Sequence, residues 1–105
     1  MANPWEGDLL LRDYELVYIV DPLVSDEDVS GVTDRITRWI SGRGGEITNI
    51  NPWGRRRLAY PIGERREGNY IAVQMRMDPS ATSDLERTLE LAEDILRHLL
   101  IRLDQ

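Results

Sequence analysis

Arginine side chains gather in one short stretch of this sequence, and arginine is well suited to bind phosphate. Five of the 13 basic residues lie between Arg55 and Arg66, with Glu64 as the one acidic residue among them. The planar guanidinium group donates two parallel hydrogen bonds to a phosphate or a carboxylate. The stretch therefore indicates contact with a nucleic-acid backbone. The alternative is a solvated edge strand on which arginines prevent aggregation, and residue types alone leave both open.

The same stretch has the pattern of a β-strand. Leu58, Tyr60 and Ile62 fall at every second position, which predicts one half-buried face. Pro52 and Pro61 have no backbone N–H to donate to a sheet ladder. We therefore expect this strand to lie at an edge of its sheet or to carry a bulge.

The rest of the chain predicts the elements that must position these arginines. Alternating apolar residues predict strands, and apolar residues at helical spacing predict helices. Ser25 and Ser83 are the expected N-caps of the two helices. The expected elements are strands at 12–20, 46–62, 69–77 and 95–103, helices at 25–42 and 79–92, and a polar loop at 63–68.

This order of elements predicts an α+β, ferredoxin-like βαββαβ fold, also called a split βαβ fold. It has a four-stranded antiparallel sheet with two helices on one face, and its first and third strands are central. We expect one such domain at residues 12–105, preceded by an N-terminal extension at residues 1–11. The predicted core comprises Leu16, Val32, Ile36, Ile71, Val73, Met75, Leu85 and Leu89.

Two strands carry more apolar residues than a sheet covered on one face requires. Val17 and Ile19 in the first strand, with Leu99 and Ile101 in the last, would lie on the face away from the helices. An exposed apolar patch on a soluble protein usually marks a binding site. We therefore expect a protein partner on this face, with Glu15 near its rim.

Composition narrows the class of protein. The formal net charge is −6, whereas proteins held on nucleic acid by charge alone are usually strongly basic. One local basic patch on an acidic chain suggests a narrow RNA contact beside a larger protein contact. The absence of cysteine excludes disulfides and thiolate chemistry. No apolar run approaches the roughly 20 residues that cross a bilayer, and no signal peptide is evident, so we expect a cytoplasmic protein without a membrane contact.

No motif indicates catalysis. The sequence has no glycine-rich phosphate loop, metal-ligand spacing or nucleophile–base pair, so we expect no enzyme, no cofactor or metal, and no small-molecule substrate. An RNA reader of the RRM type shares the topology, but its third strand would need stacking aromatic residues, and only Gly68 and Tyr70 fit that pattern. A ferredoxin-like small-ligand sensor is a further alternative, because fold alone does not define function.

One motif resembles that of a known family, bacterial small-subunit ribosomal protein six. The family motif is a glycine, a basic pair and then Leu-Ala-Tyr-Pro-Ile, and this chain has GRRRLAYPI at Gly54–Ile62. Gly63 departs from the polar or basic residue that is usual at the next position. The resemblance covers about residues 12–104, and further positions that look like the family are Asp13, Tyr14, Glu15, Asp21, Pro22, Trp53 and 96–99.

The resemblance implies a structural component of the small ribosomal subunit in the cytoplasmic ribosome. It also implies binding to the central domain of small-subunit ribosomal RNA, as a heterodimer with the basic ribosomal protein eighteen. Charge and resemblance together name the candidate RNA-binding residues Arg12, Tyr14, Arg55, Arg56, Arg57, Arg65, Arg66 and Arg97. The candidate residues for the protein partner are Glu15, Val17, Ile19, Leu99 and Ile101.

Overall fold

The computed structural model describes residues 11–103, so the predicted N-terminal extension lies almost entirely outside the described residues. Within this range no helix is long and apolar enough to cross a membrane. The elements are β1 (Arg12–Val20), α2 (Asp26–Gly42), β2 (Glu46–Ile62), β3 (Arg65–Met77), the 3-10 helix η1 (Pro79–Ala81), α3 (Thr82–Leu91) and β4 (Ile95–Arg102).

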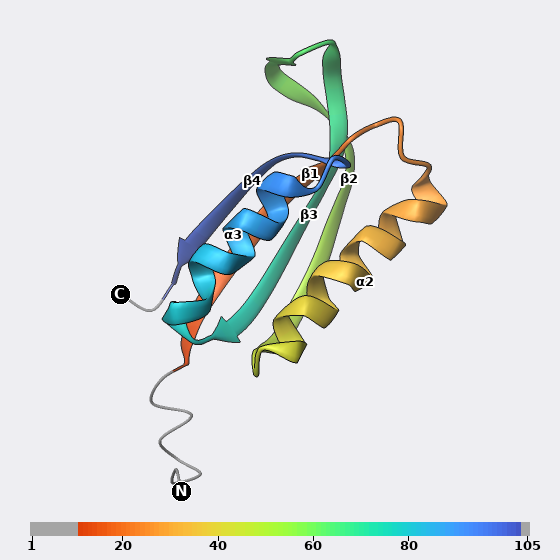
Figure 1. Ribbon diagram of the computed structural model, residues 1–105. Coiled ribbons are helices and arrows are strands. Elements are labelled where there is room, and N and C mark those ends of the chain that lie inside the picture. The colour runs from red at the N-terminus through yellow and green to blue at the C-terminus, as the bar shows by residue number, and fades with distance from the viewer. Residues whose placement is uncertain (1–10, 104–105) are drawn as a thin grey trace, which may run out of the picture.

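The four strands form one antiparallel sheet in the order β2-β3-β1-β4. Both helices lie on the same face of this sheet, and the β2–β3 hairpin extends beyond its end (Figure 1). The predicted fold is confirmed, with the first and third strands in the centre. The proline-containing strand β2 lies at an edge and has register shifts, as its two prolines predict.

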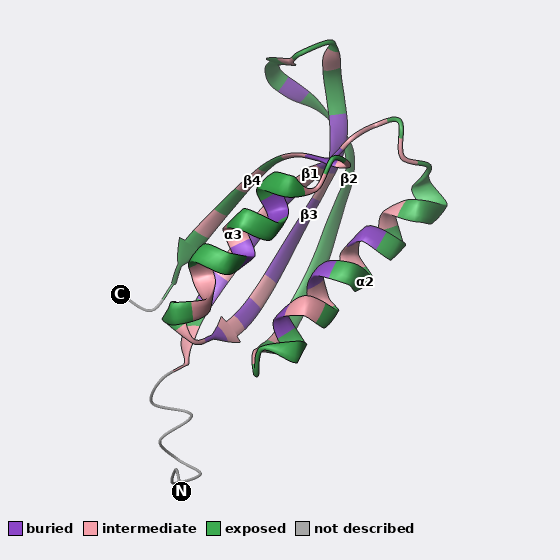
Figure 2. Cartoon of the chain, in the orientation of Figure 1, coloured by how far each residue is buried: buried purple, intermediate pink, exposed green. Residues whose placement is uncertain are grey.

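The core lies between the sheet and the helices. Every second residue of β1, from Tyr14 to Val20, is buried against them. Figure 2 shows this burial along β3 and on the inner sides of the helices, whereas the hairpin is mostly exposed. The eight predicted core residues are all buried: Leu16, Val32, Ile36, Ile71, Val73, Met75, Leu85 and Leu89.

Tyr18 is the largest fully buried side chain of the core. Its hydroxyl forms a hydrogen bond of 2.6 Å with Oγ1 of Thr33 on α2. Burial raises the pKa of Tyr18 to about 12, because the phenolate would lose its hydration, although the hydrogen bond with Thr33 partly opposes this. The sheet is thus joined to α2 by a partly buried polar contact as well as by apolar packing.

The two predicted helix caps have different outcomes. Ser25 caps α2 as predicted, because its side chain accepts a hydrogen bond from the backbone N–H of Asp28. The prediction of Ser83 is wrong, since Ser83 lies inside α3. The helical turn begins earlier, where Asp78 accepts from the N–H of Ser80 and Pro79 takes the first position of η1. Hydrogen bonding from Ser80 lowers the pKa of the Asp78 carboxyl.

The predicted polar loop at residues 63–68 is also wrong. Strand β3 begins at Arg65, and a turn of two residues separates it from Ile62, with which Arg65 pairs. Gly63 takes the first place of this turn with φ of +57°, as a hairpin turn of the II′ type requires. Residues 65–67 are charged and none of them is buried, so this start of β3 lacks the alternating apolar pattern that reveals a strand.

Candidate nucleic-acid and protein interface

The hairpin of β2 and β3 contains a wide bulge. Arg57 pairs with Glu67 and Ile62 pairs with Arg65, so the four residues of β2 from 58 to 61 lie opposite Arg66 alone. Bulges bend a strand and redirect its side chains, and they are common next to functional sites. The Leu-Ala-Tyr-Pro part of the motif is this bulge.

Two of the candidate arginines hold the hairpin in place. Arg55 donates to Glu67 at 3.0 Å and to the carbonyl of Pro22 at 3.2 Å, on the loop before α2. Arg65 donates from Nε to Oδ1 of Asp21 at 3.0 Å, and both side chains are partly buried. These guanidinium groups connect the hairpin to the loop between β1 and α2, so part of their donor capacity is already used inside the protein.

Three other arginines keep their donors for a ligand. Arg57, Arg66 and Arg97 are exposed, and within residues 11–103 no carboxylate pairs with any of them. Arg57 and Arg66 line one hollow on the hairpin, and Arg97 lines a second hollow at the base of the hairpin. Their guanidinium groups are therefore available for a phosphate.

Arg56 has a different surrounding. Its guanidinium lies 5.7 Å from the ring centre of Trp53, and its Nε donates to the Trp53 carbonyl at 3.4 Å. The Trp53 ring stacks on Tyr70, with centroids 6.0 Å apart and an interplanar angle of 11°. The three side chains form a stacked cluster on the outer face of β2 and β3.

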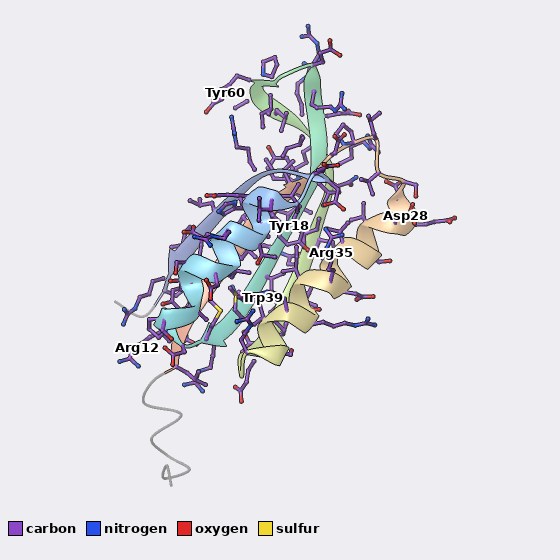
Figure 3. All side chains as sticks on the ribbon, viewed as in Figure 1. Arg12, Tyr18, Asp28, Arg35, Trp39 and Tyr60 are labelled. Atoms are coloured by element: carbon purple, nitrogen blue, oxygen red, sulfur yellow. The ribbon has the colours of Figure 1, made fainter. Side chains whose placement is uncertain are left out.

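Two candidate residues lie away from the hairpin. Tyr14 is 5% exposed and belongs to the core, so its side chain is not on the surface where RNA would bind. It shares the buried face of β1 with Leu16, as strand alternation requires. Arg12 pairs across the sheet with Met77, at the end opposite the hairpin, and Figure 3 shows Arg12 and Tyr60 at the two ends of the molecule.

The predicted apolar patch lies on the open face of the sheet. His98 contacts Glu86 of α3, so its neighbours Arg97 and Leu99 point away from the helices. Val17 pairs with Leu99, and Glu15 pairs with Ile101. Directly paired residues in an antiparallel ladder share a face, so these side chains are contiguous.

The patch is accessible in this chain. Leu99 and Ile101 are 57% and 40% exposed, and Val17 and Ile19 are partly exposed. Glu15 lies at one end of the patch, where its carboxylate accepts a hydrogen bond from Gln74 at 3.2 Å. The surface geometry is therefore as predicted, and binding of a partner there stays a prediction.

Sequence reasoning missed the exposed aromatic residues of this region. The alternating pattern predicted that Tyr60 shares a buried face with Leu58, but Tyr60 is 73% exposed while Leu58 is 7% exposed. The bulge changes the direction in which the Tyr60 side chain points, and no local sequence pattern predicts the length of the bulge. A signal was present nonetheless, because Trp53, Tyr60 and Tyr70 surround the arginine run, and aromatic residues among basic ones are typical of RNA-binding surfaces.

Comparison with known proteins identifies the family. The family model described as ribosomal protein S6 matches residues 13–102, which is most of the chain. The chain belongs to the ribosomal protein S6 family. The family predicted from the GRRRLAYPI motif is therefore confirmed.

Individual relatives agree with this assignment. Small ribosomal subunit protein bS6 of Desulforudis audaxviator is 39% identical over 94 residues, covering 90% of this chain and 100% of that protein. The bS6 protein of Desulforamulus reducens is 37% identical over 92 residues, covering 88% and 97%. The crystal structure of 30S ribosomal protein S6 from Thermotoga maritima has a TM-score of 0.84 at 29% identity, covering 89% of this chain and 88% of that one.

Membership of the S6 family gives the bulge and the open face a context. Each of these relatives is named as a protein of the small ribosomal subunit. Among the functions that the sequence left open, the family favours the ribosomal role over an RRM-type reader or a small-ligand sensor. The hairpin arginines and the open face are the two surfaces on which such a role can rest.

Proposed function

We propose that this S6 family member is a structural component of the small ribosomal subunit in the cytoplasmic ribosome, with two binding surfaces. Arg57 and Arg66 of the hairpin, together with Arg97 of β4, bind small-subunit ribosomal RNA in its central domain. The open face of the sheet, centred on Val17 and Leu99, docks ribosomal protein eighteen.

The observation that carries the RNA contact is the difference among the hairpin arginines. Arg55 and Arg65 are bound to carboxylates of the protein, whereas Arg57 and Arg66 are exposed and pair with no carboxylate of the described chain. Guanidinium groups without an internal partner are free to form bidentate contacts with phosphate. Such contacts position a protein on RNA without reading its sequence.

The observations that support the partner are the open face and the charge of the chain. Leu99 is more than half exposed in the middle of an apolar patch, and Glu15 places an acidic group beside it. A formal net charge of −6 opposes RNA binding by the chain alone and suits a basic partner. We therefore expect the heterodimer to bind RNA much more tightly than the free chain does.

The RNA contact is tested with the heterodimer and a transcript of the central domain of small-subunit ribosomal RNA. Replacing Arg57 and Arg66 together with alanine should weaken binding and lower the magnitude of the slope of log K against log salt by about 1–2. Each phosphate contact releases counterions from the RNA, so a variant with fewer contacts releases fewer of them. The matched control replaces Arg38 and Arg87, two exposed arginines on the helices. If both variants bind with the same affinity and salt slope, the hairpin arginines do not bind RNA. They would then serve the alternative role of preventing aggregation at the sheet edge.

The partner contact is tested by placing charge in the open face. A Val17→Asp, Ile101→Asp variant should fold but fail to pair with ribosomal protein eighteen in a pull-down, since two carboxylates would be buried in an apolar contact. The matched control, Leu23→Asp with Leu91→Asp, changes two exposed leucines outside this face and should pair normally. Normal pairing by the first variant would place the partner on another surface.

A further inference from the structure

Tyr60 has an unusual position for a large aromatic residue. It is 73% exposed, although the neighbouring Leu58 is buried. The bulge opposite Arg66 produces this arrangement, because Leu58 anchors one end while the extra residues turn the tyrosine ring outward. Pro61 follows directly and restricts the backbone, so the ring is presented by a stiff segment.

Two hollows meet at Tyr60, and each contains an unpaired arginine. Leu58, Ala59 and Tyr60 line the first hollow together with Arg57 and Arg66. The same three residues line the second hollow, whose other wall belongs to the open face of the sheet. The residues of that wall are Ile19, Tyr70 and Arg97.

These hollows contain no acidic lining residue. A ligand beside Tyr60 would therefore meet guanidinium groups on both sides and an aromatic ring in the middle. A matching ligand has a flat, unsaturated ring to stack on Tyr60 and an anionic group on each side of that ring to meet the guanidinium groups. A nucleotide within a single strand has this chemistry, because a phosphate flanks it on each side. An aromatic ring stacks on any base, because every base has a π-face.

We propose that Tyr60 stacks on one unpaired base of RNA, with a phosphate on one side held by Arg57 and Arg66 and a phosphate on the other side held by Arg97. This inference rests on the RNA-binding function proposed above and adds a single-stranded nucleotide as the ligand of the bulge. The base must be unpaired, because the ring needs an open face of the base and a duplex offers none.

The test compares leucine, alanine and phenylalanine at position 60 in the heterodimer, with the central-domain transcript as the probe. Tyr60→Leu keeps apolar volume but removes the aromatic face, so Kd should rise about 10-fold, and Tyr60→Ala should behave alike. Tyr60→Phe keeps the face, so its Kd should stay within about twofold of the wild type. Stacking releases no counterions, so the salt slope should remain that of the wild type in all three variants.

The outcomes separate this inference from the proposed function. If Tyr60→Leu binds like the wild type while the Arg57→Ala, Arg66→Ala variant is weakened, the stacking role is wrong and the phosphate contacts stand. If neither variant changes affinity, the hairpin does not bind this RNA at all.

Two further results would also overturn the inference. Weaker pairing of Tyr60→Leu with ribosomal protein eighteen, measured without RNA, would place Tyr60 in the protein interface. A lower salt slope in Tyr60→Leu would show that the tyrosine acts by positioning the arginines. Leu91→Ala on α3, a leucine of similar exposure, is the control for removal of exposed apolar surface.

Discussion

The two faces of the sheet differ although the same strand contributes apolar residues to both. On β1, Leu16 and Tyr18 are fully buried under the helices, while the alternating residues Val17 and Ile19 remain partly exposed. Leu99 on β4 extends this contrast, since it is 57% exposed while its chain neighbours His98 and Leu100 are partly buried. Successive side chains of a strand point to opposite faces of the sheet. An apolar residue of β1 therefore stabilises the fold if it points to the helices, and remains available for a partner if it points to the open face.

The largest expected effect compares one substitution on the two faces. Leu16→Ala should lower the free energy of unfolding by about 2–5 kcal/mol, because it removes buried methyl groups and leaves a cavity. Leu99→Ala should lower it by less than about 1 kcal/mol, because the side chain is exposed. Urea denaturation measures both. A similar loss in the two variants would mean that the open face contributes to stability in the free chain.

The second effect concerns the covered face at high pH. Between pH 10 and 12 the unfolded chain loses the Tyr18 proton while the folded chain keeps it, so the unfolded state is favoured as pH rises. Stability should fall by about 2–3 kcal/mol across this window and be fully retained below it. The chain has no lysine and no cysteine but four tyrosines, so the contribution of Tyr18 has to be separated from that of the other three.

Tyr18→Phe provides the control for this pH dependence. It should cost about 1 kcal/mol at neutral pH through the lost hydrogen bond with Thr33, and it should remove most of the alkaline slope. Urea denaturation at several pH values measures both quantities. If the stability of the variant falls with pH as steeply as that of the wild type, the pH effect belongs to another group. The contrast between the helix-covered face and the open face of the sheet would then be weaker.

The smallest effect compares two arginines of the hairpin. Arg65→Ala should cost about 1 kcal/mol, because its partly buried contact with Asp21 is lost, whereas Arg57→Ala should change stability by less than about 0.5 kcal/mol. A double-mutant cycle with Asp21→Asn isolates the pair in thermal or urea unfolding. A coupling energy near zero would mean that Arg65 is as available to RNA as Arg57.

Local patterns were sufficient for most of the fold. Period-two alternation correctly placed Leu16 and Val73 in the core, and Ser25 was recognised as a cap because its partner Asp28 is three residues away. The same reasoning failed at Ser83, since Asp78 and Pro79 start a helical turn before it. Each of these outcomes depends on residues within a few positions of one another.

The candidate site was predicted less completely. Its arginines were found by type, but the sequence did not separate Arg55 from Arg57. The partners of Arg55 lie 12 and 33 positions away, at Glu67 and Pro22, and only the folded chain brings them within hydrogen-bond distance. Tyr60 was assigned to a buried face because the length of a bulge depends on how both strands of the hairpin pair.

The sequence by itself determined the family, the order of strands and helices, and the two-sided apolar character of β1 and β4, because motif, periodicity and capping act over short distances. The tertiary structure decided which arginines are free, since Arg65 meets Asp21 across 44 positions. It also set Arg12 at the end of the sheet away from the hairpin and turned Tyr60 toward solvent. These features follow from strand register and from contacts between distant segments, which form only when the sheet assembles.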